Sequence, residues 1–225
     1  MVETPSSPSR LYGRRKGRPL RVRKTRLMKE LLPQLEITLP DKKFDPFKLF
    51  PHAPKILWLE IGFGGGEHLA ALAARHPQHG FIGCEPFVNG VASLLDHLDR
   101  EGIKNVRMLP NDARLMLDAL PDASVERCFV LFADPWPKAR HAERRFINPE
   151  NLQRLARVLA KNAELRLATD DKKLAQWTQD NLAKADDFVQ TYNAFTPPAD
   201  WVPTRYEQKA AKAGRAPVYL IYRRR

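Results

Sequence analysis

Strand-like and helix-like segments alternate along most of this 225-residue chain. Short apolar runs typical of buried strands occur at 56–61, 79–84, 105–109, 125–132, 163–168 and 187–192. Segments with apolar residues at helical spacing lie between them, at 66–76, 87–101, 149–160 and 171–184. Because this alternation is typical of βαβ units, it predicts an α/β fold with a mostly parallel sheet. A further apolar run at 217–222 predicts a last strand.

The first strand-like run ends in a glycine-rich turn. Gly62, Gly64 and Gly66 follow Glu60 in the pattern acid-x-Gly-x-Gly-x-Gly. Glycines let the backbone approach a ligand closely, and the amides at the start of the next helix attract negative charge. The dinucleotide fingerprint would place its third glycine at Glu67. Since a carboxylate there would repel a pyrophosphate, the turn favours a cofactor that carries an ammonium and a sulfonium.

Acidic residues stand at the carboxyl ends of several strand-like runs. These residues are Glu60, Glu85, Asp112 and Asp134. An acid at the place of Glu85 can accept both hydroxyls of a ribose, and Asp112 could accept the exocyclic amine of an adenine. Each acid alone could simply cap the helix that follows it. Their succession at one edge of a parallel sheet favours a nucleoside site.

The fourth strand-like run leads directly into a stiff loop, Asp134-Pro135-Trp136-Pro137-Lys138. Its prolines fix φ and remove two backbone donors, so they hold the acid, the aromatic ring and the cation in one place. This combination at the strand ends suits a flat, polar, electron-rich substrate such as a nucleobase. A proline-rich exit loop with a solvated acid explains the same residues equally well. The tryptophan could stack on a base or be a buried structural residue.

The charge of the chain indicates a polyanionic partner. It has 38 Lys and Arg against 26 Asp and Glu, a formal net charge of +12. Residues 10–29 contain ten Lys or Arg and no acid, and residues 4–9 are rich in proline and serine. We therefore expect a basic, flexible arm over residues 1–30 and a single domain over residues 31–225. Such an arm favours nucleic acid over a membrane surface, because no amphipathic apolar face accompanies it, although a solubilising tail would have the same composition.

Cysteine and histidine usage points away from disulfides and metals. Cys84 and Cys128 fall in apolar strand contexts, which favours buried thiols and a cytoplasmic protein. The six histidines show no metal-ligand spacing, so we assign no metal. We expect no signal peptide and no membrane interaction, since no apolar run is long enough to span a bilayer.

Together these motifs resemble the tRNA (guanine-N7-)-methyltransferase family of the bacterial, single-chain type. The resemblance covers about residues 57–222. It rests on Leu59–Gly66, Gly83–Glu85, Asn111–Ala113, Phe132–Lys138, Arg140-His141 with Arg144-Arg145, Ala168–Asp170 and Thr204–Glu207. One departure is Ala133, where the family usually has proline, and it leaves the loop slightly less stiff.

The resemblance implies a class I S-adenosylmethionine-dependent methyltransferase fold, Rossmann-like, with seven strands and an antiparallel last strand between its two predecessors. It implies methyl transfer to N7 of guanine 46 in the variable loop of tRNA, by a monomer or homodimer without an obligate protein partner. The cofactor contacts that it implies are Glu60, Gly62, Gly64, Gly66, Glu85, Asp112 and Asp134. The implied substrate and RNA contacts are Lys138, Arg140, Arg144, Arg145, Asp170, Thr204, Arg205, Tyr206 and Glu207.

Local structural roles are open for several of these residues. Thr204 could cap a short helix whose Glu207 completes a capping box, which is compatible with substrate binding. Asp170 could be a simple N-cap. The arginines at 140–145 lie within one or two helical turns and could form a solvated face, although their place beside the stiff loop favours RNA contact.

Guanine N7 already has a lone pair, so methylation needs no base, and positioning can supply most of the acceleration. Asp134 could stabilise the positive charge that develops on the ring, or it could only position the base. The nearest rival function is methylation of an exocyclic amine, because Asp-Pro-Trp-Pro is similar to the Asn/Asp-Pro-Pro-aromatic loop. Two functions of other kinds fit part of the pattern: a nicotinamide-dependent oxidoreductase, which Glu67 disfavours, and an RNA-binding module without catalysis.

Overall fold

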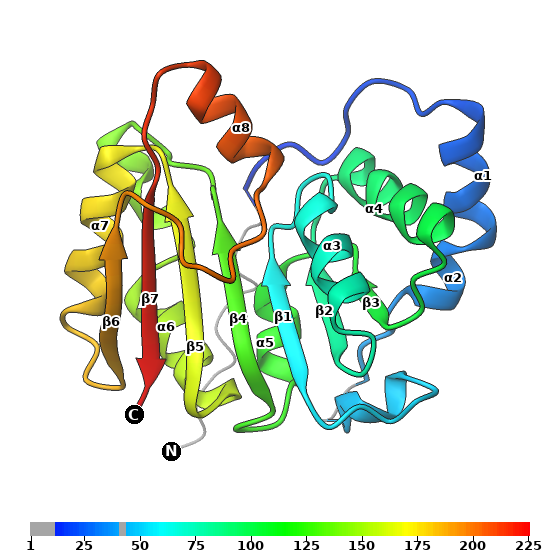
Figure 1. Cartoon of the computed structure of the whole chain (residues 1–225), viewed down its shortest axis with the longest axis horizontal. Helices are drawn as coiled ribbons and strands as arrows, with labels where there is room; N and C mark the ends of the chain where they lie inside the picture. Colours follow the sequence, from blue (N-terminus) through cyan, green and yellow to red (C-terminus); the bar gives the residue numbers. More distant parts are fainter. Residues whose placement is uncertain (1–11, 41–43) are drawn as a thin grey trace.

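The computed structural model describes residues 12–40 and 44–225, and within this part a seven-stranded sheet forms the core (Figure 1). Its strands are β1 (Leu57–Ile61), β2 (Gly80–Cys84), β3 (Val106–Leu109), β4 (Val125–Leu131), β5 (Leu159–Thr169), β6 (Phe188–Ala194) and β7 (Val218–Arg224). Their spatial order is β3-β2-β1-β4-β5-β7-β6. The first five strands in this spatial order, β3, β2, β1, β4 and β5, are parallel. Strand β7 runs antiparallel between β5 and β6. The predicted fold class and the place of the last strand are therefore confirmed.

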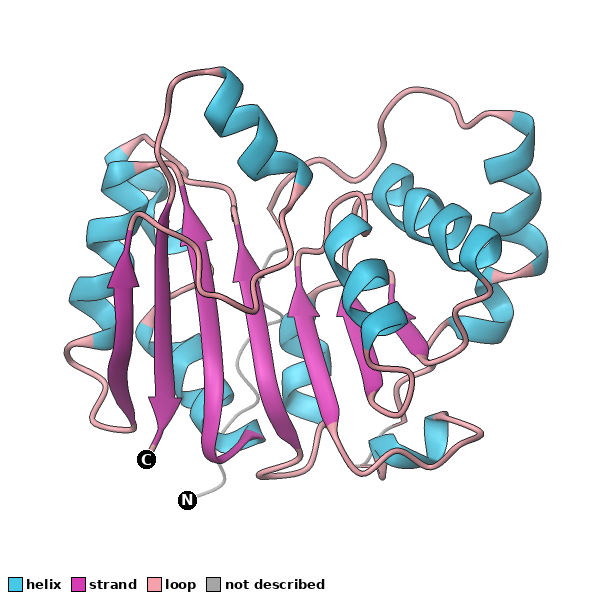
Figure 2. Ribbon diagram, in the orientation of Figure 1, coloured by secondary structure: helices cyan, strands magenta, loops and turns pink. Residues whose placement is uncertain are grey.

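Helices cover both faces of the sheet (Figure 2). One face carries α1 (Val22–Glu30), α2 (Leu32–Leu35), α3 (Glu67–Arg75) and α4 (Val88–Glu101). The other face carries α5 (Ala113–Ala119), α6 (Pro149–Val158) and α7 (Lys172–Leu182). Short 3-10 helices occupy Pro46–Leu49 and Ala139–Arg144, called η1 and η2, and α8 (Arg205–Lys212) lies above the carboxyl ends of the strands.

The core consists of two apolar clusters, one on each face of the sheet. Strand side chains alternate between the faces, so Leu57, Leu59 and Ile61 of β1 enter one cluster and Trp58 enters the other. Amphipathic helices complete each cluster with residues such as Leu94 of α4. The predicted strands and longer helices match these elements, whereas α1, α2, α5 and the two 3-10 helices were not predicted.

Part of the predicted flexible arm is helical and packed on the domain. Helix α1 lies against α4, with Leu27 buried between them. Arg23 Nε lies 2.6 Å from Asp96 Oδ1 on α4. Residues 22–30 thus contact the domain, and the boundary at residue 30 stays a prediction. The segment 1–11 lies outside the described residues, and the flexibility of the arm stays a prediction.

The order of the strands reverses between β1 and β4. The chain proceeds from β1 through β2 to β3 on one side, and from β4 to β5 on the other. The crossover helices of the two halves leave the carboxyl ends of β1 and β4 uncovered, and such switch points are where open α/β sheets bind ligands. No helix in the described ranges is both long and apolar enough to cross a membrane.

Candidate active site

A cavity of about 370 Å³ lies at this switch point. The segments that follow β1, β2, β3 and β4 line it, together with the N-terminal segment and α8. Its lining includes Tyr12, Gly13, Arg14, Gly62, Gly64, Glu85, Phe87, Asp112, Asp134, Trp136, Arg144, Phe146 and Tyr206. The acids predicted after the second, third and fourth strands therefore meet in one cavity.

The glycine turn after β1 has a backbone that favours glycine. Gly62, Gly64 and Gly66 have φ values of 73°, 56° and 80°, in the left-handed region. A Cβ on Gly64 would lie 3.2 Å from Tyr206 Cε2, so the turn passes close to α8. Gly62 and Gly64 line the cavity, whereas Gly66 begins α3, where a Cβ would collide with α4. Gly66 was predicted to contact the cofactor, but in the structure it allows α3 to pack closely against α4.

Glu85 ties the glycine turn to the start of α4. Its Oε2 accepts the Gly64 N–H at 2.8 Å, and its Oε1 accepts the Phe87 N–H at 2.9 Å. Burial raises the pKa of Glu85 above its ordinary value, and the negative charges of Asp134 and Glu60 raise it further. The two hydrogen bonds act in the opposite direction and lower it. Each oxygen keeps a second lone pair, so Glu85 can still accept hydrogen bonds from a ligand.

Glu60 does not line the cavity. Its Oε2 is 2.7 Å from His68 Nδ1 on α3, and both side chains are buried. The His68 ring packs edge-on against Phe129 of β4, with centroids 5.0 Å apart. The structure thus places the predicted cofactor contact in a buried pair between β1 and α3. The sequence missed this because it does not show which face of the strand Glu60 occupies.

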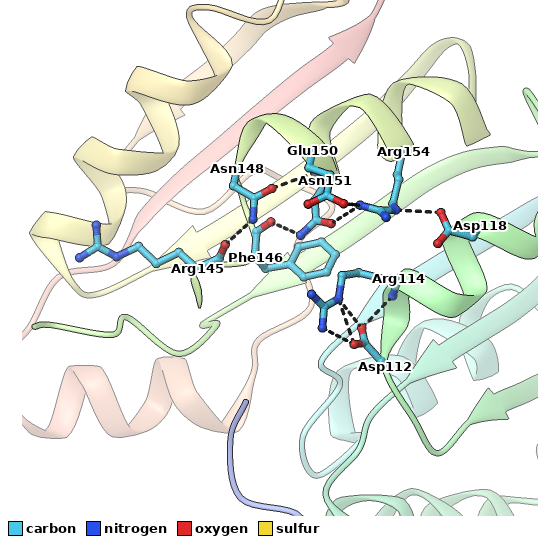
Figure 3. Close-up of polar contacts among 9 residues, drawn as sticks. All are labelled: Asp112, Arg114, Asp118, Arg145, Phe146, Asn148, Glu150, Asn151 and Arg154. Atoms are coloured by element: carbon cyan, nitrogen blue, oxygen red, sulfur yellow. Dashed lines mark hydrogen bonds and ion pairs between the residues drawn. The ribbon is translucent and has the colours of Figure 1, made fainter. Parts of the chain in front are cut away.

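Asp112 caps a helix and also lines the cavity, and its contact with adenine stays a prediction. Its Oδ1 accepts the Arg114 N–H at 3.0 Å and so caps α5. Both carboxylate oxygens also bind the Arg114 guanidinium (Figure 3). The Asn111 side chain accepts the N–H of Asp112 at 2.9 Å. These bonds fix the carboxylate at the wall of the cavity.

The loop after β4 adopts an unusual backbone around Asp134. Phe132 and Trp136 have φ values of 51° and 43°, which are rare for residues with large side chains. Such conformations persist only where the surroundings enforce them, and they gather at functional sites. Here the Phe132 N–H donates to the Ala168 carbonyl of β5 at 2.7 Å. Asp134 is exposed, and its carboxylate faces the cavity.

Arg145 holds this loop from inside the protein. Its Nε donates to the Pro135 carbonyl at 2.9 Å, and an Nη donates to the Trp136 carbonyl at 3.3 Å. The guanidinium also lies over the Trp177 ring, 5.0 Å from its centroid, and only 7% of the residue is exposed. The sequence predicted RNA contact here; the structure shows the guanidinium bound to the loop and to Trp177, and contact with RNA stays a prediction.

Hydrogen bonds fix the segment that follows the loop (Figure 3). Asn148 caps α6, and its Nδ2 donates to the carbonyl of Arg145 at 3.1 Å. Asn151 Nδ2 donates to the Phe146 carbonyl at 2.8 Å. Arg154 then links α6 to Asp118 of α5 at 2.7 Å. The Phe146 wall of the cavity is therefore anchored to two helices.

The other predicted basic residues divide into two groups. Lys138 and Arg140 are exposed beside the cavity, at the start of η2. Arg144 reaches the cavity, and its guanidinium carbon lies 4.3 Å from the Tyr12 ring centroid and 5.2 Å from that of Trp136. Its Nε is buried and has no hydrogen-bond partner among the described residues.

Helix α8 confirms the predicted capping box. Thr204 Oγ1 accepts the Glu207 N–H at 3.0 Å, and Glu207 Oε2 accepts the Thr204 N–H at 3.3 Å. Glu207 also accepts hydrogen bonds from Trp201 Nε1 at 2.9 Å and from the Tyr219 hydroxyl at 2.7 Å. Thr204 and Glu207 are thus committed to holding α8, and neither lines the cavity.

Tyr206 is the α8 residue that reaches the cavity. Its ring stacks on Phe132, with centroids 6.4 Å apart. Burial raises the pKa of Tyr206, and the negative charges of Glu85 and Asp134 raise it further. The neighbouring Arg205 is exposed, with an Nη 4.0 Å from Glu67.

Asp170 lies away from the cavity. Its Oδ2 accepts a hydrogen bond from Arg215 Nε at 2.6 Å, which links β5 to the segment before β7. Asp171 caps α7 by accepting the Leu174 N–H at 2.8 Å, so Asp170 is not the cap. The predicted substrate contact of Asp170 stays a prediction.

Several lining residues were missed from the sequence, namely Tyr12, Gly13, Arg14, Phe87 and Phe146. An aromatic residue within the basic arm was the one signal that could have pointed to Tyr12. Cys84 and Cys128 are buried free thiols, as predicted. Among the described residues, no group of three His, Cys, Asp or Glu side chains is arranged to hold a metal ion.

Comparison with known proteins places the chain in a family. A family model described as "Putative methyltransferase" matches residues 54–220. A tRNA (guanine-N(7)-)-methyltransferase of Rhodospirillum rubrum is 50% identical, over 100% of this chain and 91% of the relative. One of Paramagnetospirillum magneticum is 51% identical, over 96% of this chain and 93% of the relative. The chain belongs to the tRNA (guanine-N(7)-)-methyltransferase family.

Solved structures of more distant methyltransferases share the fold of this family member. The 16S rRNA methyltransferase KamB aligns with a TM-score of 0.58 and 14% identity, covering 81% of this chain and 95% of that one. An rRNA methylase from Streptococcus thermophilus aligns with a TM-score of 0.52 and 11% identity, covering 92% and 99%. At this identity the likeness shows the class I fold alone.

Substitution of Glu85 by Gln tests its burial. Because the folded pKa is raised above an ordinary value near 4.5, the stability from this group is fully present below that pH. It is lost as the pH rises through the folded pKa, at about 1.4 kcal/mol per pKa unit. We expect urea unfolding to show that Glu85→Gln gains stability relative to the wild type as the pH rises from 4 to 8, because only the wild type loses stability through this group. Parallel pH profiles would contradict this.

Proposed function

We propose that this chain transfers the methyl group of S-adenosylmethionine to N7 of guanine 46 in the variable loop of tRNA. The observation that carries the proposal is the meeting of Glu85, Asp112 and Asp134 in one cavity, beside the rigid loop with Trp136. Family membership supports both the reaction and the substrate class. The cofactor, when bound, supplies an electrophilic methyl group on a sulfonium.

The residues present fit this cofactor. The cavity volume of about 370 Å³ is in the range of small-molecule sites. Glu85 keeps free lone pairs for the ribose hydroxyls, and Asp112 stands where the adenine would lie. The glycine turn at Gly62 and Gly64 admits a ligand close to its backbone. The carboxylates favour a ligand that carries positive charge.

Methyl transfer to guanine N7 requires the protein mainly to position the base. Because N7 has a lone pair, the chain needs no group to remove a proton. Asp134 stands at the end of β4 with its carboxylate toward the cavity, where it can stabilise the charge that develops on the purine or hold the donors of the base. The strained, anchored loop keeps this carboxylate in place, which suits a reaction that depends on alignment.

The surface beside the cavity suits a polyanion. Lys138 and Arg140 are exposed on one side and Arg205 on the other. With the net charge of +12, these cations would neutralise tRNA phosphates around the target nucleotide. We propose that the protein acts in the cytoplasm, as a monomer or homodimer without an obligate protein partner.

Methylation of unmodified tRNA by the purified full chain tests the function. We expect labelled cofactor to give 7-methylguanosine at position 46 on nucleoside analysis. The variant Asp134→Ala should lose roughly 100-fold or more in kcat, with cofactor affinity changed by no more than a few fold. A product methylated on an exocyclic amine, or near-wild-type turnover of the variant, would contradict the proposal. Asp134→Asn separates charge from positioning, since it keeps the shape and removes the charge.

Substitutions of Arg140 and of Arg145 should affect the salt dependence of tRNA binding differently. We expect Arg140→Gln to weaken tRNA binding and to reduce the slope of log K against log salt by roughly one, because one phosphate contact is lost. Arg145→Gln should leave that slope unchanged and lower kcat, because the loop loses its internal anchor. Binding titrations at several salt concentrations check this. An equal loss of slope in both variants would refute the positioning role of Arg145.

A further inference from the structure

The N-terminal segment 12–18 lies across the cavity. Tyr12, Gly13 and Arg14 contribute to its lining, although they stand far from the other lining residues in the sequence. Figure 1 shows this segment in dark blue, running from α1 over the carboxyl edge of the sheet toward the space above β1 and β4. The segment thus bridges the part of the cavity after β2 and the loop after β4.

One end of the segment is fixed to the start of α4. The Val88 N–H donates to the Arg15 carbonyl at 2.9 Å. Asn89 makes two further bonds, since its Oδ1 accepts the Gly17 N–H at 2.7 Å and its Nδ2 donates to the Arg18 carbonyl at 2.7 Å. A Cβ on Gly17 would collide with the Asn89 side chain at 2.7 Å, so the approach requires glycine. Asn89 does not line the cavity itself.

The other end brings an aromatic ring to the acceptor side. The Tyr12 ring lies under the Arg144 guanidinium at 4.3 Å and edge-on to Trp136, with centroids 6.2 Å apart and planes at 72°. A Cβ on Gly13 would lie 3.8 Å from Asp134 Oδ2, so the backbone passes beside this carboxylate. Tyr12 keeps 39% of its surface exposed, which leaves area for a further contact.

The stacked arginine has an unused donor. Arg144 Nε is buried without a partner among the described residues, while the rings of Tyr12 and Trp136 fix the plane of the guanidinium. Nε itself is closed off, but Arg144 lines the cavity, so the other N–H groups of its guanidinium are the donors that an acceptor on a bound base would meet. Guanine presents O6 next to N7 on one edge, and arginine is the usual partner of that edge. Adenine presents an amine in place of O6, which this donor would reject.

We propose that segment 12–18 forms one wall of the acceptor half of the cavity. Tyr12 stacks on Arg144 so that the guanidinium reads O6 of the target guanine, and Asn89 is the residue that positions the segment. This inference rests on the proposed function and adds to it the groups that select guanine. Tyr12 and Arg144 contact the substrate, whereas Asn89 acts through the segment that it holds.

Variants of Tyr12 and Asn89 in the full chain test the proposal. We expect Tyr12→Ala to lower kcat/KM for tRNA about 10- to 100-fold, as expected for loss of one stacking contact. Tyr12→Phe should keep nearly full activity because the ring remains. Asn89→Ala should fall between the two, with its affinity for S-adenosylhomocysteine and its melting temperature close to wild type. Val22→Ala, exposed on α1, is the matched control and should behave as wild type.

A modified substrate tests the reading of O6. Replacement of the target guanine by 2-aminopurine keeps N7 and removes O6. We expect this replacement to lower kcat/KM of the wild type about 10- to 100-fold. It should lower kcat/KM of the Tyr12→Ala variant much less, because both changes disrupt the same contact between Arg144 and O6. Fully additive losses would overturn the proposal, and so would a Tyr12→Ala variant as fast as wild type. A wild type that makes no 7-methylguanosine would instead refute the proposed function itself.

Discussion

The site depends on the reversal of strand order between β1 and β4. Parallel strands all end at the same edge of the sheet, and a crevice opens at that edge where the connections from two neighbouring strands run to opposite faces. Here the strand order proceeds outward from β1 on one side and from β4 on the other. The segments after β1, β2, β3 and β4 line one cavity at this point. The glycine turn, Glu85, Asp112 and Asp134 are brought together by this topology rather than by closeness in sequence.

Several groups at this edge are held at a cost to stability. Glu85 is buried with a raised pKa, and Phe132 and Trp136 have backbone conformations that side chains rarely adopt. Interactions around them provide the compensation. The Glu85 oxygens accept two backbone N–H groups, and Arg145 donates to two carbonyls of the strained loop. Such local strain is expected where a protein must hold reacting groups in place.

The sequence predicted the features that follow from periodic patterns and from the geometry of a parallel sheet. Buried strands and longer helices were predictable from apolar periodicity, and the acids at strand ends were predictable because parallel strands share an edge. Helix α5 was missed because it has only seven residues. The basic composition of α1 predicted flexibility, yet Arg23 pairs with an acid of α4 and Leu27 is buried against it. Composition does not show such tertiary partners.

Side-chain direction was the part that the sequence could not provide. Glu60 lies near the end of β1 and Glu85 directly follows β2, but Glu60 pairs with His68 of α3, whereas Glu85 lines the cavity. Arg144 and Arg145 are adjacent, yet one enters the cavity and the other anchors the loop from inside. In each pair the direction is set by contacts with other elements of the fold, and the local sequence pattern does not show these contacts.

The most direct test of the central claim is a crystal structure of the full chain with S-adenosylhomocysteine. We expect the nucleoside in the cavity at the carboxyl ends of β1 and β4, with ribose hydroxyls within hydrogen-bond distance of Glu85 and the adenine beside Asp112. We also expect the sulfur to face the loop of Asp134. A nucleoside bound elsewhere, or bound in this cavity without contact to Glu85, would contradict the claim.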